Sequence, residues 1–328
     1  MQDSHKERID VLLVEKGLAD SREKAKRIIM AGLVFVDQQR IDKPGTNVLA
    51  DNNIEIRGAA NPYVSRGGLK LEKALKQFNI QVKDRVWLDV GASTGGFTHC
   101  LLENEAKLIY SMDVGYEQLA WELRQNSRVI VMERTNIRYV KKEDLASVPQ
   151  GAVIDVSFIS LKLVLPVVVE LIANNSPIIA LIKPQFEVGK GKVGKNGVVR
   201  EKALHIKVLT EISGFSETLG LELQGLDFSP ITGPEGNIEF LAYFYKGKLD
   251  PMVQSLSVLI NEIVFKAHNF QLIQGYLRRV HKKSSARAAE KKYESFGYSL
   301  CISTMPTGYL VIRKRDIQQI RSHIGAWR

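Results

Sequence analysis

The chain has 328 residues, of which 45% are hydrophobic and 25% charged, and this composition is typical of soluble globular proteins, not of disordered or fibrous ones. The two cysteines, Cys100 and Cys301, are too few and too far apart for a disulfide framework or a metal site, and they suit a reducing, cytoplasmic location. The net charge is +10, and residues 275–328 carry +9 of it. Such an excess suits a polyanionic partner, but many basic proteins bind no nucleic acid, so charge alone leaves the partner open.

Membrane insertion is not expected. The most apolar stretch, Leu161–Ile182, is interrupted by Lys162, Pro166 and Glu170, whereas a bilayer span needs about 20 largely uncharged residues. The N-terminal sequence MQDSHKERID is also too polar for a secretory signal.

Residues 1–60 have the pattern of a small domain that begins with two helices. Hydrophobic residues at helical spacing predict a helix over Arg8–Lys16, which Gly17 ends as a left-handed cap. A second helix is predicted over Arg22–Ala31, with Ser21 as its N-cap.

Short strands follow these helices. Alternating residues predict strands over 33–36 and 53–56, so the domain should hold a small sheet. The second helix carries four basic residues within six positions: Arg22, Lys24, Lys26 and Arg27. This cluster suits either an RNA contact or a solvated helix face, and by itself it favours the solvated face.

The segment Arg8–Val48 resembles the S4-like RNA-binding domain. The matching positions are Arg8, Leu12, Gly17, Ser21, Arg22, Ala25, Ile29, Gly32, Val34, Val36 and Pro44. The resemblance implies that the second helix lies on structured RNA, with Arg22 and Lys26 as contacts. Phosphate contacts of this kind position a protein without reading sequence.

Residues 61–64 are expected to link this domain to a second one over residues 65–247. A helix is predicted from Ser65, and then strands and helices alternate. The predicted strands are 85–90, 107–113, 128–133, 152–156, 177–182, 221–228 and 239–245, and the helices between them are 97–103, 116–124, 158–173 and 202–219. This order predicts an α/β fold, a Rossmann-like methyltransferase with a mostly parallel seven-stranded sheet and helices on both faces. The last two strands are expected to pair as a hairpin-like edge.

A glycine-rich turn follows the first of these strands. It contains Asp89, Gly91, Ser93 and Gly95 and opens a helix, an arrangement that cradles anions and nucleotide-like ligands. Because Ser93 stands where a dinucleotide fingerprint needs glycine, the turn favours S-adenosylmethionine over a nicotinamide dinucleotide.

Two later residues complete the expected cofactor site. Asp113 ends the second strand, where an acid accepts hydrogen bonds from ribose hydroxyls. Asn136, after the third strand, is a candidate for adenine contact and equally suits a turn.

Two charged residues end later strands. Asp155 is expected at the carboxyl end of the fourth strand and Lys183 at that of the fifth, and the carboxyl ends of parallel strands line the ligand crevice. A buried lysine is costly unless it is paired, so Lys183 beside Asp155 indicates a site more than packing.

The motifs DVGASTGGFT, DVSFIS, LIKPQFEVGK, GVVRE and GPEGNIEF resemble the TlyA (haemolysin A) family, and the resemblance covers about residues 6–247. It implies an FtsJ-like catalytic domain with a Lys-Asp-Lys-Glu tetrad, here Lys70, Asp155, Lys183 and Glu239. It also implies methylation of ribose 2′-hydroxyls of cytidine in ribosomal RNA, with S-adenosylmethionine as the cofactor and no metal.

A ribose hydroxyl must lose its proton, or nearly so, to attack the methyl group. Partial burial and the neighbouring cation Lys70 would lower the pKa of Lys183, whereas Asp155 and Glu239 would oppose this change, and the sequence does not decide which effect prevails. Lys183 is expected to act as the base or as an electrostatic orienter of the oxygen, and the base is the preferred role. We also expect the target nucleotide to leave its helix. The loop Gly189–Gly197, with Lys190, Lys192 and Lys195, suits a flap over RNA and equally an ordinary solvated loop.

Residues 248–328 form a basic extension to which the sequence assigns no role. A helix is predicted over 256–277 and a hairpin over 298–313, and an added RNA clamp and a structural appendage both remain open. Two further functions also remain: a non-catalytic ribosome-assembly factor, which needs no intact tetrad, and a membrane-lytic haemolysin, which needs amphipathic or spanning segments that the sequence does not show. The target nucleotide, the ribosomal subunit and the oligomeric state are not predicted.

Overall fold

The computed structural model describes residues 5–30, 32–57, 61–189, 191–249, 255–283, 303–304 and 310–311. The chain divides into two compact units, one of residues 1–60 with 275–328 and one of residues 61–274. Lys190 and residues 58–60, directly before the expected linker 61–64, lie outside the described residues, as does most of the chain after residue 283.

The N-terminal part of the first unit contains the two predicted helices, α1 (Ile9–Glu15) and α2 (Arg22–Met30). Gly17 ends the first of them with a φ of 68°, and the Ser21 hydroxyl accepts a hydrogen bond from the backbone N–H of Lys24. The strands form two small antiparallel sheets, one of β1 (Lys6–Arg8) and β4 (Asn47–Leu49), the other with β2 (Val34–Val36) between β3 (Gln39–Ile41) and β5 (Ile54–Ile56). The expected small α+β region is therefore confirmed.

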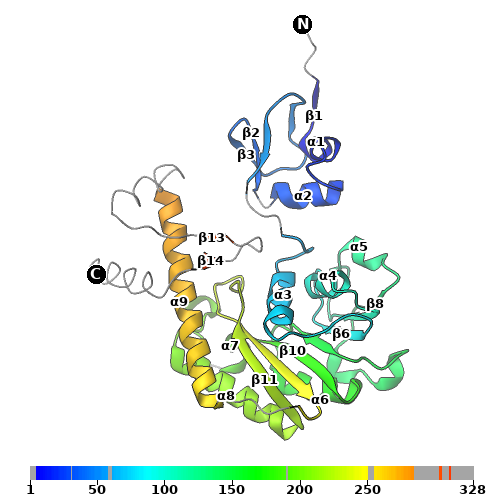
Figure 1. The fold of residues 1–328 in the computed structure, drawn as a ribbon, viewed down its shortest axis with the longest axis vertical. Helices are drawn as coiled ribbons and strands as arrows, with labels where there is room; N and C mark the ends of the chain where they lie inside the picture. The colour runs from blue at the N-terminus through cyan, green and yellow to red at the C-terminus, as the bar shows by residue number, and fades with distance from the viewer. Residues whose placement is uncertain are drawn as a thin grey trace, which may run out of the picture. The chain divides into compact units, whose positions relative to one another are not determined.

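The second unit is built on a seven-stranded sheet in the order β11-β12-β10-β9-β6-β7-β8 (Figure 1). Its strands are β6 (Val86–Val90), β7 (Leu108–Met112), β8 (Val129–Met132), β9 (Ala152–Ile154), β10 (Ser176–Ile182), β11 (Leu221–Phe228) and β12 (Phe240–Lys246). Five of them run parallel, and β12 pairs antiparallel with both β10 and β11. The predicted fold class and the antiparallel edge pair are confirmed.

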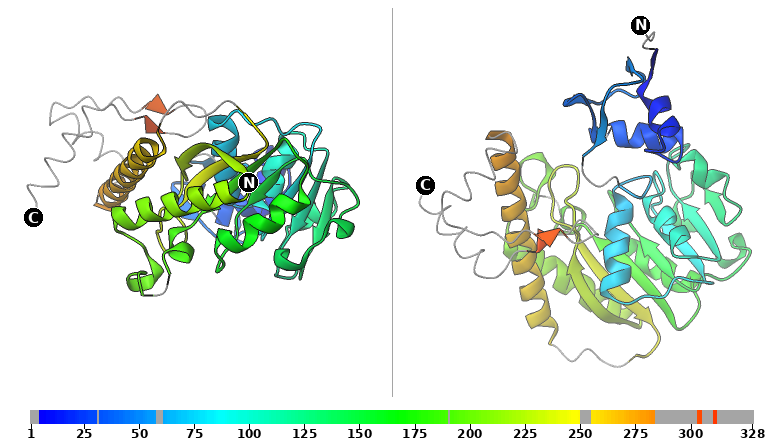
Figure 2. Two further views of the ribbon diagram at one scale, coloured as in Figure 1. Left: turned by 90° about the horizontal axis from the view of Figure 1, so that it is seen from below. Right: turned by 45° about the horizontal axis from the view of Figure 1, so that its top comes forward.

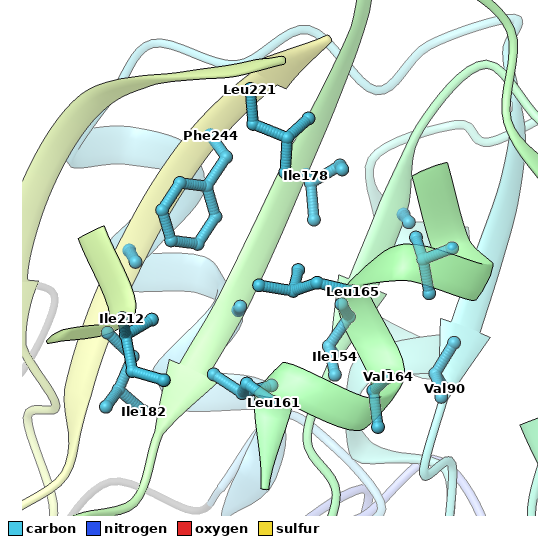
Figure 3. Close-up of a cluster of buried hydrophobic side chains, with 14 of the residues drawn as sticks. Val90, Ile154, Leu161, Val164, Leu165, Ile178, Ile182, Ile212, Leu221 and Phe244 are labelled. Carbon is cyan, nitrogen blue, oxygen red and sulfur yellow. The ribbon is translucent and has the colours of Figure 1, made fainter. Parts of the chain in front are cut away.

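Helices cover both faces of this sheet, because its strands are hydrophobic on both sides. On one face, α6 (Leu161–Leu171), α8 (Lys202–Thr218) and the first half of α9 (Leu256–Lys283) enclose the larger core, part of which Figure 3 shows. On the other face, α3 (Gly67–Gln77) and α4 (Gly96–Glu103) pack over Trp87, Val153 and Ile179. Figure 2 shows the same layers from two further directions.

The segment after β7 differs from its prediction. A helix was expected over 116–124, but only α5 (Trp121–Arg124) forms. The Asp113 carboxylate accepts the backbone N–H of Gly115, and the N–H of Ala120 bonds to the Thr94 carbonyl. The residues before α5 are therefore tied to the glycine-rich turn instead of to one another.

At the C-terminus, α9 extends six residues beyond its predicted end. Within the predicted hairpin, β13 (Ser303–Thr304) pairs antiparallel with β14 (Leu310–Val311), and its other residues lie outside the described ones. Among the helices that are described, none has the length and apolar character needed to cross a membrane.

Candidate active site

Four charged residues meet at one edge of the sheet because of its register. Asp155 follows β9 and Lys183 follows β10, so both lie at the carboxyl ends of parallel strands. Since β12 runs antiparallel, its first residue, Phe240, pairs with Ile182, which places Glu239 beside Lys183. Lys70 reaches the same edge from α3, and the expected tetrad is thereby assembled from four separate segments.

The tetrad is a chain of ion pairs. The Nζ atom of Lys183 lies 2.6 Å from Oδ1 of Asp155, and Nζ of Lys70 lies 3.7 Å from Oδ2 of the same carboxylate. Lys70 is also 2.7 Å from Oε2 of Glu239. Two ammonium groups and two carboxylates alternate, so the cluster is neutral overall.

Burial and charge act against each other in this cluster. Burial favours the neutral amine at Lys70, but the carboxylates of Asp155 and Glu239 outweigh it and raise the pKa of Lys70 above its ordinary value. Burial raises the pKa of Glu239, although Lys70 opposes that effect. Because two carboxylates face Lys70, we describe it as an ammonium. Glu239 pairs with this charge at 2.7 Å.

Lys183 has fewer charged neighbours than Lys70. Its ammonium contacts one carboxylate, that of Asp155, and donates a hydrogen bond to Oγ of Ser157 at 2.9 Å. An ammonium has three N–H groups, so these two contacts, the ones found among the described residues, leave one direction for a further oxygen.

The glycine-rich turn places a buried acid beside the tetrad. Asp89, on β6, is fully buried, and its Oδ2 accepts a hydrogen bond from the Thr98 hydroxyl at 2.6 Å. Its Oδ1 is buried without a hydrogen-bond partner among the described residues, and burial raises the pKa of Asp89 to about 7. An orphaned buried acceptor of this kind is a feature of ligand sites.

Gly91 allows the turn to approach the tetrad closely. Its φ is 89°, and a Cβ atom placed on it would lie 2.6 Å from the backbone oxygen of Asp155. Only glycine combines this conformation with this contact. The tetrad and the expected cofactor turn are therefore in direct backbone contact.

The other expected cofactor residues cluster at the same strand ends. The Asp113 carboxylate accepts the backbone N–H of Ser93 at 2.8 Å, and Gly95, with a φ of 97°, is the N-cap of α4. The Asn136 side chain accepts the backbone N–H of Arg138 at 3.2 Å and so caps a short 3-10 helix, Ile137–Tyr139. This contact accounts for Asn136 as a turn residue.

The expected RNA contacts of α2 differ in their surroundings. Arg22 lies 3.0 Å from Oδ2 of the buried Asp10, which also pairs with Arg8 at 2.9 Å. Lys26 makes a longer ion pair, 3.8 Å, with Glu23 at the helix surface. Arg22 therefore has a structural partner, whereas Lys26 is more available to an outside ligand.

The expected contacts in the loop after β10 are described only in part. Lys192 is exposed, and Lys190 lies outside the described residues.

Phe158 was not predicted to belong to a site. It is 91% exposed with a φ of 64°, and its ring centroid lies 5.1 Å from that of Phe186. The only sequence signal for it was an aromatic residue three positions after Asp155.

Comparison with known proteins identifies both parts of the chain. Residues 63–246 match the FtsJ-like methyltransferase family, and residues 7–54 match the S4 domain family. "Putative rRNA methyltransferase YqxC" of Bacillus subtilis is 56% identical over 243 residues, which cover 74% of this chain and 86% of that protein.

Two further similarities extend this comparison. "16S/23S rRNA (cytidine-2'-O)-methyltransferase TlyA" of Mycobacterium tuberculosis is 43% identical over 237 residues, covering 72% of this chain and 88% of that protein. A solved structure, "Putative hemolysin from Streptococcus thermophilus", is 47% identical with a TM-score of 0.64 and covers 81% of this chain and 97% of that one. With the FtsJ-like match spanning more than half of its length, the chain belongs to the TlyA (hemolysin A) family, which joins an S4 domain to an FtsJ-like methyltransferase domain.

Proposed function

We propose that the chain is an S-adenosylmethionine-dependent methyltransferase that modifies a ribose 2′-hydroxyl of a cytidine in ribosomal RNA. The observation that carries this proposal is the ion-paired tetrad of Lys70, Asp155, Lys183 and Glu239 at the carboxyl ends of the strands. The names of the M. tuberculosis and Campylobacter jejuni relatives support the cytidine 2′-hydroxyl as the target.

The residues of the glycine-rich turn fit S-adenosylmethionine, which supplies the methyl group when bound. Asp89 offers a buried oxygen that has no partner in the part of the chain that the structure describes, and Gly91 and Gly95 adopt left-handed backbone conformations that keep the turn open to a ligand. Ser93 and Asp113 complete the set, the latter as the acid for the ribose hydroxyls. Asn136 is retained as a candidate for adenine contact in addition to its capping role.

Lys183 is the residue that acts on the hydroxyl. Asp155 and Ser157 hold its amine from two sides, and the third direction is available to the 2′-oxygen. Once Lys183 has released its ammonium proton, its amine nitrogen accepts the hydroxyl proton as the oxygen attacks. Lys70 pairs with Asp155 and with Glu239, so that neither carboxylate is buried without a cation.

The N-terminal S4 domain and the lysines of the loop 189–197 are proposed to hold the RNA. Lys26 and Lys192 contact phosphates, with Lys190 beside the latter in sequence, and Arg22 contributes while it also stabilises Asp10. On this proposal the affinity for ribosomal RNA resides largely in residues 1–60, and the chemistry in residues 65–247.

The proposal is tested with Lys183→Ala. Methyl transfer from radiolabelled S-adenosylmethionine should be abolished, while binding of the cofactor and of ribosomal RNA should stay close to wild type. The substrate is ribosomal subunits from cells that lack the protein, and the 2′-O-methyl group is then mapped in the RNA.

Lys73→Met is the matched control. Lys73 is a partly buried lysine of the same helix as Lys70, but it pairs with Asp227 at 2.8 Å outside the tetrad, so its loss should leave turnover largely intact. Normal turnover by Lys183→Ala would refute the role of Lys183. Wild-type protein that binds the RNA without methyl transfer would favour the ribosome-assembly alternative.

A further inference from the structure

Asn237 makes a buried contact that the tetrad does not account for. It is 3% exposed, and its Oδ1 accepts the backbone N–H of Val199 at 3.0 Å. Its Nδ2 donates to the carbonyl of Gly197 at 2.9 Å. One side-chain amide thus satisfies both a donor and an acceptor of another segment, as a neighbouring strand would.

The segment held in this way is the end of the basic loop, which we define as residues 189–197. Gly197 is its last residue, and Val198 and Val199 directly after it are buried. The exposed Lys192 lies within the loop. Asn237 therefore fixes the point at which the basic loop enters the core.

Asn237 is also attached to the tetrad. Its backbone carbonyl accepts the N–H of Gly233 at 3.0 Å, which closes the turn 233–237. A Cβ atom on Gly233 would lie 2.8 Å from Oε1 of Glu239 and 3.8 Å from Cβ of Asn237, so the turn packs directly on the Glu239 carboxylate. Glu239 lies two residues after Asn237 in the chain, and it pairs with Lys70 at 2.7 Å.

The turn has a second anchor on its other side. The side chain of Gln271, on α9, donates a hydrogen bond to the carbonyl of Gly236 at 2.8 Å. The N–H of Gly233 bonds to the Asn237 carbonyl and the N–H of Gly236 to the Gly233 carbonyl, so the turn moves as a unit. A displacement of the basic loop must therefore either break the amide contacts of Asn237 or move the turn, and with it Glu239.

From these contacts we propose that Asn237 is a positioning residue that couples the basic loop to Glu239, so that engagement of RNA by the loop sets the final geometry of the tetrad. The proposal rests on the methyltransferase function proposed above. It makes the basic loop part of the catalytic cycle, and not only a source of affinity for phosphate.

The contact between Asn237 and the end of the basic loop can be tested without an activity assay. Hydrogen exchange of the backbone amide of Val199 should be faster in Asn237→Ala than in wild type, by roughly tenfold for the loss of one buried hydrogen bond. Ile212→Val, a small change in the core of α8, controls for general destabilisation. If Val199 exchanged as slowly in Asn237→Ala as in wild type, Asn237 would not hold the end of the basic loop, whether or not the protein is a methyltransferase.

The coupling is tested by a double-mutant cycle with Lys192→Ala, using ribosomal RNA as the substrate. Asn237→Ala should lower kcat by about tenfold and leave the affinity for S-adenosylmethionine unchanged, since Asn237 does not contact the glycine-rich turn in the structure. In the Asn237→Ala background, Lys192→Ala should have less effect on kcat than in wild type, because the loop no longer acts on Glu239. Effects on kcat that simply multiply would overturn the coupling, as would a change in KM alone.

Discussion

Asp89 offers a direct test of how the cofactor turn is held. It is fully buried, one of its oxygens has no hydrogen-bond partner within the described ranges, and its pKa is raised by burial from 3.8 to about 7. An acid whose folded-state pKa is raised stabilises the fold while it is protonated in both states. That stability is lost as pH rises from about 4 through 7, because the unfolded chain ionises freely and the folded one does not. In Asp89→Asn the side chain cannot ionise, so the decrease in folding stability between about pH 4 and pH 7 should disappear.

The magnitude follows from the shift. At about 1.36 kcal/mol for each pH unit, ionised Asp89 costs the folded state at most about 4 kcal/mol by pH 8. Relaxation and water penetration reduce such penalties, so we expect about 2 kcal/mol. For a unit of this size, that corresponds to a melting temperature about 4–8 °C higher in Asp89→Asn than in wild type.

The assay is thermal unfolding of the full chain at pH 4.5 and pH 8, without cofactor. The difference between Asp89→Asn and wild type should be large at pH 8 and small at pH 4.5. Asp84→Asn, an exposed aspartate in the same unit, controls for the loss of one acidic side chain. A difference that is the same at both pH values would refute the reasoning, because it would show that Asp89 does not resist ionisation in the fold.

Two further predictions concern RNA. Lys26→Gln should weaken binding to ribosomal subunits, with a shallower salt dependence and an unchanged melting temperature. Arg22→Gln should also destabilise the N-terminal domain by about 1–3 kcal/mol, because the buried Asp10 loses a partner. Equal effects of the two changes on the melting temperature would contradict this distinction. We expect the extruded target base to stack on the exposed ring of Phe158, so Phe158→Ala should lower kcat by roughly tenfold, with partial recovery in Phe158→Tyr, because stacking of a base on an aromatic ring is worth about 1–3 kcal/mol. The checks are single-turnover methylation and the fluorescence of a base analogue at the target, and full activity of Phe158→Ala on a duplex-locked target would rule out a base-stacking role.

The sheet could be predicted because its strands are short, strongly hydrophobic runs separated by turn residues. β10 and β11 were placed within one residue at each end, and the antiparallel edge pair was expected. The three-residue strands β1, β3 and β4 were missed, because alternation over three residues is not distinguishable from a loop. The helix expected over 116–124 was overestimated for a tertiary reason, since the Asp113 carboxylate and the Thr94 carbonyl hold its first residues.

Asp155 and Lys183 were expected side by side at neighbouring strand ends, and they pair. Lys70 and Glu239 were identified only from motif resemblance, and their pairing was not predictable. Lys70 and Glu239 are 169 positions apart, and only the antiparallel register of β12 brings Glu239 to Lys183. Asn237 was invisible for a different reason. In GPEGN it has the composition of a turn, and nothing in the sequence shows that its side chain leaves the turn to bind Gly197 and Val199.

The pairing also limits what single substitutions at the tetrad can mean. Removing Lys70 leaves Glu239, which is 2% exposed, without the ammonium 2.7 Å away, and breaking a buried pair in this way costs about 3–5 kcal/mol. Loss of activity after such a change reports damage to the fold as much as loss of a catalytic group. Lys183 differs, because its removal leaves Asp155 still facing Lys70 at 3.7 Å. Lys183 is therefore the member of the tetrad whose substitution separates chemistry from stability, whereas Lys70 and Glu239 have to be changed together.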